Sequence, residues 1–228
     1  SAEGREIRKV FICNAGCNII SIDYSQVELR LLAHVAKIKT LINAFNNESD
    51  IHSITAMEVF QLPENKITSE LRRKAKIINF GIIYGISAYG LALQLEISNK
   101  EAKMYMDQYF LKYPGIKDYM KQTINQCRVD GFVKTPFGRR IFIPFINDKI
   151  ATRRNFAERS AINAPIQGAA ADMIKYVMPK VHNFLMEEKL KTKILLQVHD
   201  ELVFESPLDE VEIIKNEVPK IMVSSHRD

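Results

Sequence analysis

Cysteine is scarce in this chain, and its scarcity excludes two classes of small protein. Among 228 residues there are three cysteines, Cys13, Cys17 and Cys127. Cys13 and Cys17 have no second pair to complete a zinc site, and three thiols cannot build a disulfide scaffold. The composition therefore favours a reducing, cytosol-like compartment.

Targeting, repeat and linker sequences are also missing. Residues 1–8 are charged and lack the apolar run of a secretory signal peptide. No internal repeat, low-complexity run or Gly/Ser-rich linker indicates a flexible boundary. With 46% hydrophobic and 26% charged residues, the composition is that of an ordinary soluble globular domain. The net charge of +5 only weakly favours an anionic partner.

One uncharged run, residues 77–95, has the length of a membrane span and follows a cluster of cations. Three glycines, two tyrosines and several polar side chains make it poor in aliphatic residues, and no other segment could pair with it in a bilayer. We therefore expect no membrane helix and no membrane partner.

Hydrophobic periodicity predicts a strand, then many helices, then a β-hairpin. Gly131 and Pro136 fall in a stretch of short strands and turns, and Pro165 and Gly168 are expected to break a long helical segment. The hairpin is expected to turn at residues 199–201, without the Gly or Asn that such turns prefer. The predicted strand covers residues 18–23, the predicted helices 26–37, 51–60, 68 onward, 100–112, 116–128 and 151–190, the hairpin 193–205, and a last amphipathic helix starts at Asp209. This order predicts an α+β fold, in which a small antiparallel sheet carries a large, mostly helical insertion.

Carboxylates occur at the ends of two predicted strands. Asp23 ends the first strand, and Asp200 and Glu201 lie at the tip of the hairpin. If these strands pair, the carboxylates meet at one rim, where two charges about 4 Å apart repel by about 4 kcal/mol at an effective dielectric near 20. A cation with oxygen ligands, Mg²⁺ or Mn²⁺, would relieve that repulsion and suit phosphoryl transfer. From spacing alone, solvated strand ends are the simpler interpretation.

Two further side-chain series recur every four residues. One helix face changes from cationic to aromatic side chains along the series Arg72, Lys76, Phe80 and Tyr84. Such a face suits a nucleotide, with its phosphates on the cations and its base against a ring. A helix that docks its aromatic side chains into the core fits the pattern equally well. Arg159, Asn163 and Gln167 could contact nucleic acid, but a solvated helix face is the simpler interpretation of that pattern.

Three segments resemble the motifs of bacterial family-A DNA polymerases, the polymerase I group. Residues 23–30 (DYSQVELR) resemble motif A, residues 72–85 (RRKAKIINFGIIYG) resemble the fingers helix, and residues 197–205 (QVHDELVFE) resemble motif C. The similarity covers almost the whole chain, including residues 50–52 and 163–168. The resemblance implies palm segments at 1–50 and 151–228, and fingers at 51–150.

The resemblance also assigns roles to residues. It implies a DNA-directed DNA polymerase that adds dNMP from dNTP to a primer 3′-hydroxyl and releases pyrophosphate by a two-metal-ion mechanism. The implied catalytic residues are Asp23, Asp200 and Lys76; the ligands of two Mg²⁺ ions, which Mn²⁺ could replace, are Asp23, Tyr24, Asp200 and Glu201; the nucleotide site is Glu28, His52, Arg72, Lys76, Phe80 and Tyr84; and the DNA contacts are Arg159, Asn163, Gln167 and His199.

The same resemblance sets expectations for the wider protein. The partners are primer-template DNA and dNTP, and the expected form is a monomer in the bacterial cytoplasm at the nucleoid, with an organelle as the other location. The roles are DNA replication and repair. The family's thumb, exonuclease-like domain and last palm strand are expected to lie outside this chain, so the 228 residues alone should be weakly active or inactive. Two alternatives stay open: the palm and fingers of a single-subunit RNA polymerase, and a non-catalytic nucleic-acid-binding fragment.

Overall fold

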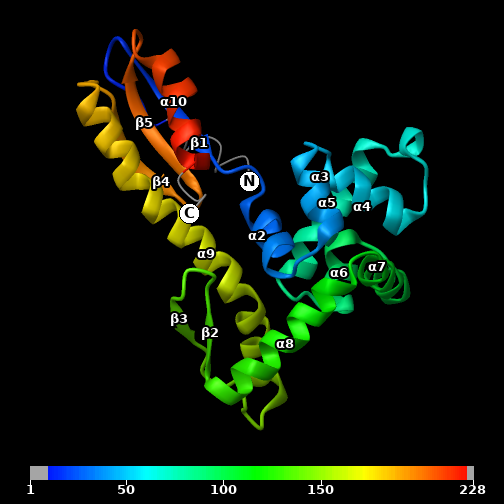
Figure 1. The fold of residues 1–228 in the computed structure, drawn as a ribbon. Helices are drawn as coiled ribbons and strands as arrows, with labels where there is room; N and C mark the ends of the chain where they lie inside the picture. Colours follow the sequence, from blue (N-terminus) through cyan, green and yellow to red (C-terminus); the bar gives the residue numbers. More distant parts are fainter. Residues whose placement is uncertain (1–9, 225–228) are drawn as a thin grey trace. The chain divides into compact units, whose positions relative to one another are not determined.

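A computed structural model describes residues 10–224, which form two compact units (Figure 1). One unit combines the two ends of the chain, up to Ser25 and from Ala170 onward. The other contains residues 26–169. The charged stretch at residues 1–8 and the last four residues lie outside the described part of the chain. The palm and fingers boundaries at residues 50 and 150 stay a prediction, since packing alone does not define those functional subdomains.

The first unit is built on a three-stranded antiparallel sheet. Its strands are β1 (Cys17–Asp23), β4 (Lys193–Val198) and β5 (Glu201–Pro207), in the order β1-β5-β4. Strands far apart in the sequence therefore pair, with Ile20 opposite Phe204. The α+β class, with a helical insertion between the first strand and the hairpin, is confirmed.

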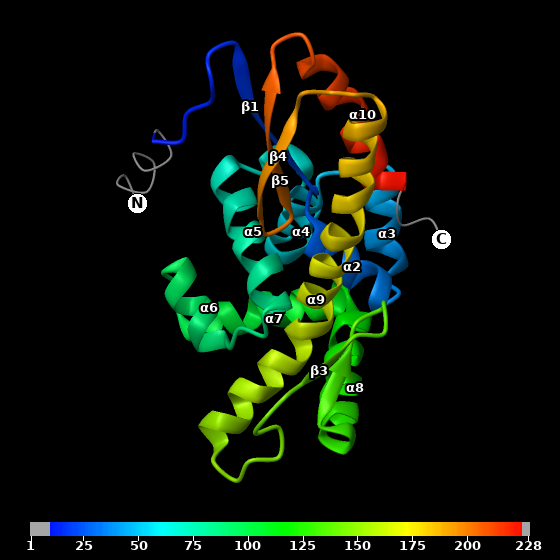
Figure 2. The same cartoon turned by 90° about the vertical axis from the view of Figure 1, so that its left-hand side faces the viewer.

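Two helices cover one face of this sheet. Alternation along β5 turns Leu202 and Phe204 inward, where both are fully buried. They pack against the second half of α9 (Ala151–Glu187) and against α10 (Val211–Ser224), in one apolar cluster. Figure 2 shows both helices on the same side of the sheet. The opposite face therefore stays uncovered by helices of this unit.

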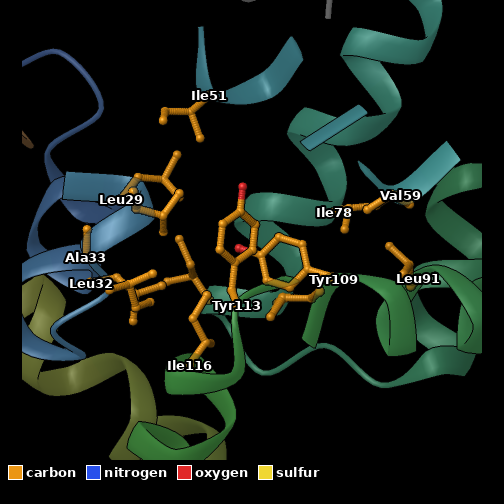
Figure 3. Close-up of a cluster of buried hydrophobic side chains, with 14 of the residues drawn as sticks. Leu29, Leu32, Ala33, Ile51, Val59, Ile78, Leu91, Tyr109, Tyr113 and Ile116 are labelled. Carbon is orange, nitrogen blue, oxygen red and sulfur yellow. The ribbon is translucent and has the colours of Figure 1, made fainter. Parts of the chain in front are cut away.

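The second unit is a helical assembly with one small hairpin. Its elements are α2 (Val27–Val35), α3 (Lys39–Asn46), α4 (Ile51–Phe60), the 3₁₀ turn η1 (Glu64–Lys66), α5 (Ser69–Ile83), α6 (Ala88–Leu95), α7 (Asn99–Lys112), α8 (Pro114–Asp130), β2 (Phe132–Lys134), β3 (Arg140–Phe142) and the first half of α9. Figure 3 shows the rings of Tyr109 and Tyr113 side by side in its main core, with Leu29 and Leu32 on one side. This core fixes α2, α4 and α5, which carry most of the predicted nucleotide residues.

Helix boundaries follow local capping chemistry. Ser98 and Glu101 form the predicted capping box at the start of α7. Pro114 lies just after the end of α7 and occupies the first turn of α8. A backbone N–H in the first turn has no intrahelical acceptor, so proline loses no hydrogen bond there. The helix α3 was not predicted, because its short apolar pattern lacks start and stop residues.

The break predicted at Pro165 and Gly168 is wrong, because α9 continues through both residues. Pro165 and its neighbour Ile166 are buried, so packing compensates for the lost backbone hydrogen bond. Glycine at 168 lets the β2–β3 hairpin approach the helix, since a Cβ there would lie 2.7 Å from Thr135 Cγ2. Tertiary contacts thus override local propensity.

The uncharged run 77–95 divides between the end of α5 and α6, with a turn between them. Within residues 10–224, no helix is both long enough and apolar enough to cross a membrane.

Candidate active site

Strand pairing brings the predicted motif A and motif C carboxylates to one end of the sheet. Asp23 lies directly opposite Glu201 in the β1–β5 register. The ladder continues one step further, because the Tyr24 N–H donates to the Asp200 carbonyl at 3.2 Å. Directly opposed residues project from the same face of an antiparallel pair, so Asp23 and Glu201 share a face. The structure therefore brings the motif A and motif C carboxylates together, which their spacing in the sequence alone did not establish.

The turn that presents Asp200 is strained. The β4–β5 hairpin turns at His199 and Asp200, and His199 has a φ of 53°, in the left-handed region. A non-glycine residue pays roughly 1–2 kcal/mol for this conformation. The absence of Gly or Asn here indicates that these side chains are kept for their chemistry.

The three carboxylates have no cationic partner in the part of the chain that the structure describes. Asp23 is exposed, and Asp200 and Glu201 are half-buried. Among residues 10–224, no Lys or Arg forms an ion pair with any of them. In the same part of the chain, no three His, Cys, Asp or Glu side chains cluster closely enough to hold a metal ion by themselves. The donor set, all oxygen and mostly solvent-facing, suits Mg²⁺, which takes one or two protein carboxylates and fills its other positions with water and substrate phosphate.

The second unit presents the predicted nucleotide residues on α5. Thr68 caps this helix by accepting from the Leu71 N–H at 3.2 Å, which fixes where the four-residue periodicity begins. Arg72 and Lys76 are exposed, and Phe80 is half-buried one turn further on. Tyr84 follows directly after the last helical residue. Among the described residues Lys76 has no ion-pair partner, so its ammonium is available to an anion.

Arg72 is held by Asp50 at the start of α4. Its Nε and Nη2 donate to the two Asp50 carboxylate oxygens at 2.6 and 3.2 Å. Asp50 also accepts from the His52 N–H and the Ser53 hydroxyl, at 3.1 and 2.6 Å. Burial raises the pKa of Asp50, but the hydrogen bonds from Arg72 and Ser53 outweigh that effect and bring it to about 2. Asp50 is therefore ionised at neutral pH and fixes the plane of the guanidinium.

Aromatic rings continue the site along α5. The rings of Phe80 and Tyr84 are stacked, 25° from parallel with centroids 6.4 Å apart, and the His52 ring lies 5.9 Å from that of Phe80. The Tyr84 hydroxyl donates to the Glu28 carboxylate on α2. Glu28, which the resemblance places in the nucleotide site, is thereby tied to the aromatic end of the series.

A cavity of about 520 Å³ opens beside this face of α5. Its lining includes Lys76, Phe80, Tyr84 and Arg159, and pockets of this size are typical of small-ligand sites. Glycine is required at 85, where φ is +67° and a Cβ would lie 3.0 Å from Arg159 Cγ. This glycine lets the turn after α5 lie close to Arg159 of α9.

Comparisons with known proteins agree with this geometry. The family model for DNA polymerase family A matches residues 1–227. The chain belongs to DNA polymerase family A. DNA polymerase I of Pseudomonas aeruginosa is 48% identical over 222 residues, covering 97% of this chain and 24% of that protein. DNA polymerase I of Rhizobium leguminosarum is 52% identical over 214 residues, covering 93% of this chain and 21% of that protein.

A solved family-A structure has the same fold. It is described as the POL domain of Pol1 from M. smegmatis in complex with DNA primer-template and dNTP, and it matches with a TM-score of 0.92 and 42% identity. The match covers 99% of this chain and 40% of that one. This chain spans about a quarter of the length of the curated family-A relatives described above.

The structure groups the predicted family-A residues within each unit. Asp23, Tyr24, Asp200 and Glu201 meet at the end of the sheet, with His199 in the adjoining turn. In the other unit, Arg159 lines the α5 cavity, and the Asn163 amide lies 3.4 Å from the Tyr84 carbonyl, at the limit of a hydrogen bond. Gln167 lies exposed on the same helix.

The family resemblance assigned no role to three residues that the structure adds to the site. Asp50 holds Arg72, while Asn79 and Thr55 form a buried hydrogen-bonded chain with His52. A polar residue in an otherwise apolar helix stretch was the available signal for Asn79, and a carboxylate just before an apolar helix was the signal for Asp50.

Proposed function

We propose that this chain is the palm and fingers part of a DNA-templated DNA polymerase, which adds dNMP from dNTP to a primer 3′-hydroxyl and releases pyrophosphate. The observation that carries the proposal is the β1–β5 register, which places Asp23 opposite Glu201 and next to Asp200. The M. smegmatis relative, described in complex with DNA primer-template and dNTP, supports the same partners for this chain.

At the end of the sheet, Asp23 and Asp200 would hold Mg²⁺, with the Tyr24 carbonyl and Glu201 nearby. Mg²⁺, or Mn²⁺ in its place, would supply activation of the 3′-hydroxyl and neutralisation of the leaving oxygen. The protein itself would hold the Asp23 and Asp200 carboxylates at one end of the sheet. The strained His199 turn fixes Asp200, and His199 itself would contact the primer-template.

On α5, Arg72 and Lys76 would bind the triphosphate, with His52 as a third contact. Lys76 is also the residue from which we expect a proton for the departing pyrophosphate. Phe80 would stack on the incoming base and sugar, and Tyr84 would flank the templating position. Glu28, held by Tyr84, would exclude a ribose 2′-hydroxyl.

Arg159, Asn163 and Gln167 project from one helix at four-residue spacing, and we assign them to the primer-template near its growing end. We also propose that the protein is a monomer that works in the bacterial cytoplasm at the nucleoid, in DNA replication and repair. Purified alone, the 228 residues should bind DNA weakly and with strong salt dependence.

Primer extension by variants of the full-length protein tests the carboxylates. Asp23→Ala and Asp200→Ala should each abolish extension while largely sparing primer-template affinity. Asp209→Ala, an exposed carboxylate of the same unit, is the matched control and should extend normally. Normal extension by either rim variant would refute the metal-binding assignment.

A single-subunit RNA polymerase is the second candidate, since it shares the palm. The Tyr84–Glu28 hydrogen bond argues against it, because it holds the Glu28 carboxylate where we propose that it excludes a ribose 2′-hydroxyl. Single-nucleotide incorporation of dNTP against rNTP separates the two, and a preference for rNTP would overturn the proposal.

A further inference from the structure

A buried chain of hydrogen bonds joins α4 to α5 directly behind the proposed triphosphate site. The Thr55 hydroxyl lies 3.1 Å from Asn79 Oδ1, and Asn79 Nδ2 lies 3.1 Å from His52 Nδ1. Thr55 and Asn79 are fully buried, and His52 is 3% exposed. Polar groups so deeply buried are costly unless each is satisfied, so the direction of every bond in this chain matters.

In the structure, Asn79 Oδ1 faces the Thr55 hydroxyl and Asn79 Nδ2 faces His52. An amide oxygen can only accept and an amide NH₂ can only donate, so the Thr55 hydroxyl donates to Oδ1 and the Nδ2 group faces His52. The opposite amide orientation would pair the NH₂ group with the Thr55 oxygen and Oδ1 with a protonated Nδ1, so the orientation of Asn79 and the tautomer of His52 are coupled.

The orientation of Asn79 decides the tautomer of His52. Because Nδ2 donates, Nδ1 must accept and carries no proton. The neutral imidazole therefore has its proton on Nε2, the ring nitrogen that Asn79 does not use. Protonation of the ring would place an Nδ1–H against the amide NH₂, so the charged form is opposed by geometry.

The surrounding charges act in the same direction. Burial lowers the pKa of His52 below its ordinary value, and the cations Arg72 and Lys76 on α5 lower it further. Asp50, on the N-terminal side of His52, is the one charged neighbour among the described residues that raises it. The net shift of the His52 pKa is downward, so burial and the two cations favour the neutral ring.

We infer that Asn79 is a positioning residue, which holds His52 as the neutral Nε2–H tautomer so that the ring donates a hydrogen bond to an anionic phosphate oxygen. The inference rests on the proposed function, and it adds the protonation state of the donor and the residue that sets it. A neutral donor recognises the phosphate without changing charge when the nucleotide binds or leaves. Affinity for the nucleotide is then insensitive to pH around neutrality.

Nitrogen NMR of the imidazoles tests the tautomer directly, with the His52 signals assigned by their loss in His52→Gln. In the native 228-residue chain, His52 should show a protonated Nε2, an unprotonated Nδ1 and titration below the ordinary histidine range. In Asn79→Asp, a carboxylate faces Nδ1 and stabilises the imidazolium, so the titration should move upward. Thr55→Val removes the hydroxyl that orients the amide, and should yield a mixture of tautomers even where Asn79→Asp fails to fold.

Nucleotide incorporation by the full-length protein tests the consequence. His52→Gln and Asn79→Leu should each raise KM for dNTP by about 2- to 10-fold, the range of one lost hydrogen bond, with a smaller change in kcat. In Asn79→Asp, KM should vary with pH across the neutral range, where the native KM is flat. Glu58→Gln is the matched control, because Glu58 lies on the same helix α4 but pairs with Lys112 of α7, and it should keep native KM and pH dependence.

The outcomes separate the two levels of the proposal. A protonated Nδ1 in the native chain, or a His52 titration unmoved by Asn79→Asp, overturns the role of Asn79. If the tautomer is as expected but His52→Gln leaves KM unchanged, the proposed phosphate contact fails while the tautomer assignment stands. If His52→Gln raises KM and Asn79→Leu behaves like the native protein, the positioning role is refuted.

Discussion

Replacing Asp50 by alanine removes three hydrogen-bonded contacts at the start of α4. The carboxylate caps the helix by accepting from the His52 N–H, and it also accepts from the Ser53 hydroxyl. It forms an ion pair with Arg72, whose Nε and Nη2 both donate to it. Loss of an N-cap costs about 1 kcal/mol. The ion pair adds at most about 1 kcal/mol, because both side chains are more than a third exposed. We expect Asp50→Ala to lower the free energy of unfolding by about 1.5–2 kcal/mol.

Asp50→Asn separates the two contributions. Asparagine caps helices as well as aspartate does, so this variant should lose only the ion pair, about 1 kcal/mol or less. For a chain of this length, Asp50→Ala should lower Tm by about 3–8 °C and Asp50→Asn by about 4 °C at most. Both should raise KM for dNTP, since Arg72 is no longer held.

The pH dependence provides a second measurement. The pKa of Asp50 falls from 3.8 to about 2 on folding, so its contribution to stability is complete above the unfolded value and disappears as the pH drops toward 2. Thermal denaturation across this acid range should show the native protein converging on Asp50→Ala. Equal Tm values for the native protein and Asp50→Ala at neutral pH would refute the reasoning.

Three further changes test other parts of the fold and site. Glu210→Ala should lower the free energy of unfolding by about 3 kcal/mol or more. The buried carboxylate accepts from the Lys191 and Thr192 N–H groups and from the Thr192 hydroxyl, and all three bonds are lost. Urea denaturation measures this loss, and a value below about 1 kcal/mol would contradict the prediction. Gly85→Ala should cost about 1–2 kcal/mol at a φ of +67° and weaken primer-template binding by displacing Arg159, as gel-shift titration would show. His199→Gly should relieve a left-handed φ and leave Tm unchanged or higher, while lowering primer-template affinity; a lower Tm would argue against strain in that turn.

Much of the fold could be predicted from the sequence where local chemistry is decisive. The capping box at Ser98, the α4 range and the hairpin that turns at Asp200 follow from patterns of a few residues. Pro165 was misjudged, because a helix whose flanks are buried tolerates a residue that would end an isolated helix.

The sequence could predict which helix or strand carries each proposed site residue, but not the contacts between these elements. The spacing of Arg72, Lys76 and Phe80 on one helix is a property of the local sequence, and the structure confirms it. The pairing of Asp23 with Glu201 depends on a strand register across nearly 180 residues, which no local pattern contains. The bonds from Asp50 to Arg72 and from Asn79 to His52 likewise join separate helices, so only the folded chain reveals them.

The strand β1 also has a consequence for how the chain acquires its structure. It is synthesised before the helical unit, but its partner β5 begins only at Glu201, after the entire helical unit has been made. Residues 26–169 are contiguous in sequence and can collapse while translation continues, whereas β1 must wait with its backbone groups unpaired. Closing the sheet is therefore expected to be a late step, and prior folding of the helical unit shortens the effective loop that must close. The carboxylate rim would form only when that last pairing is complete.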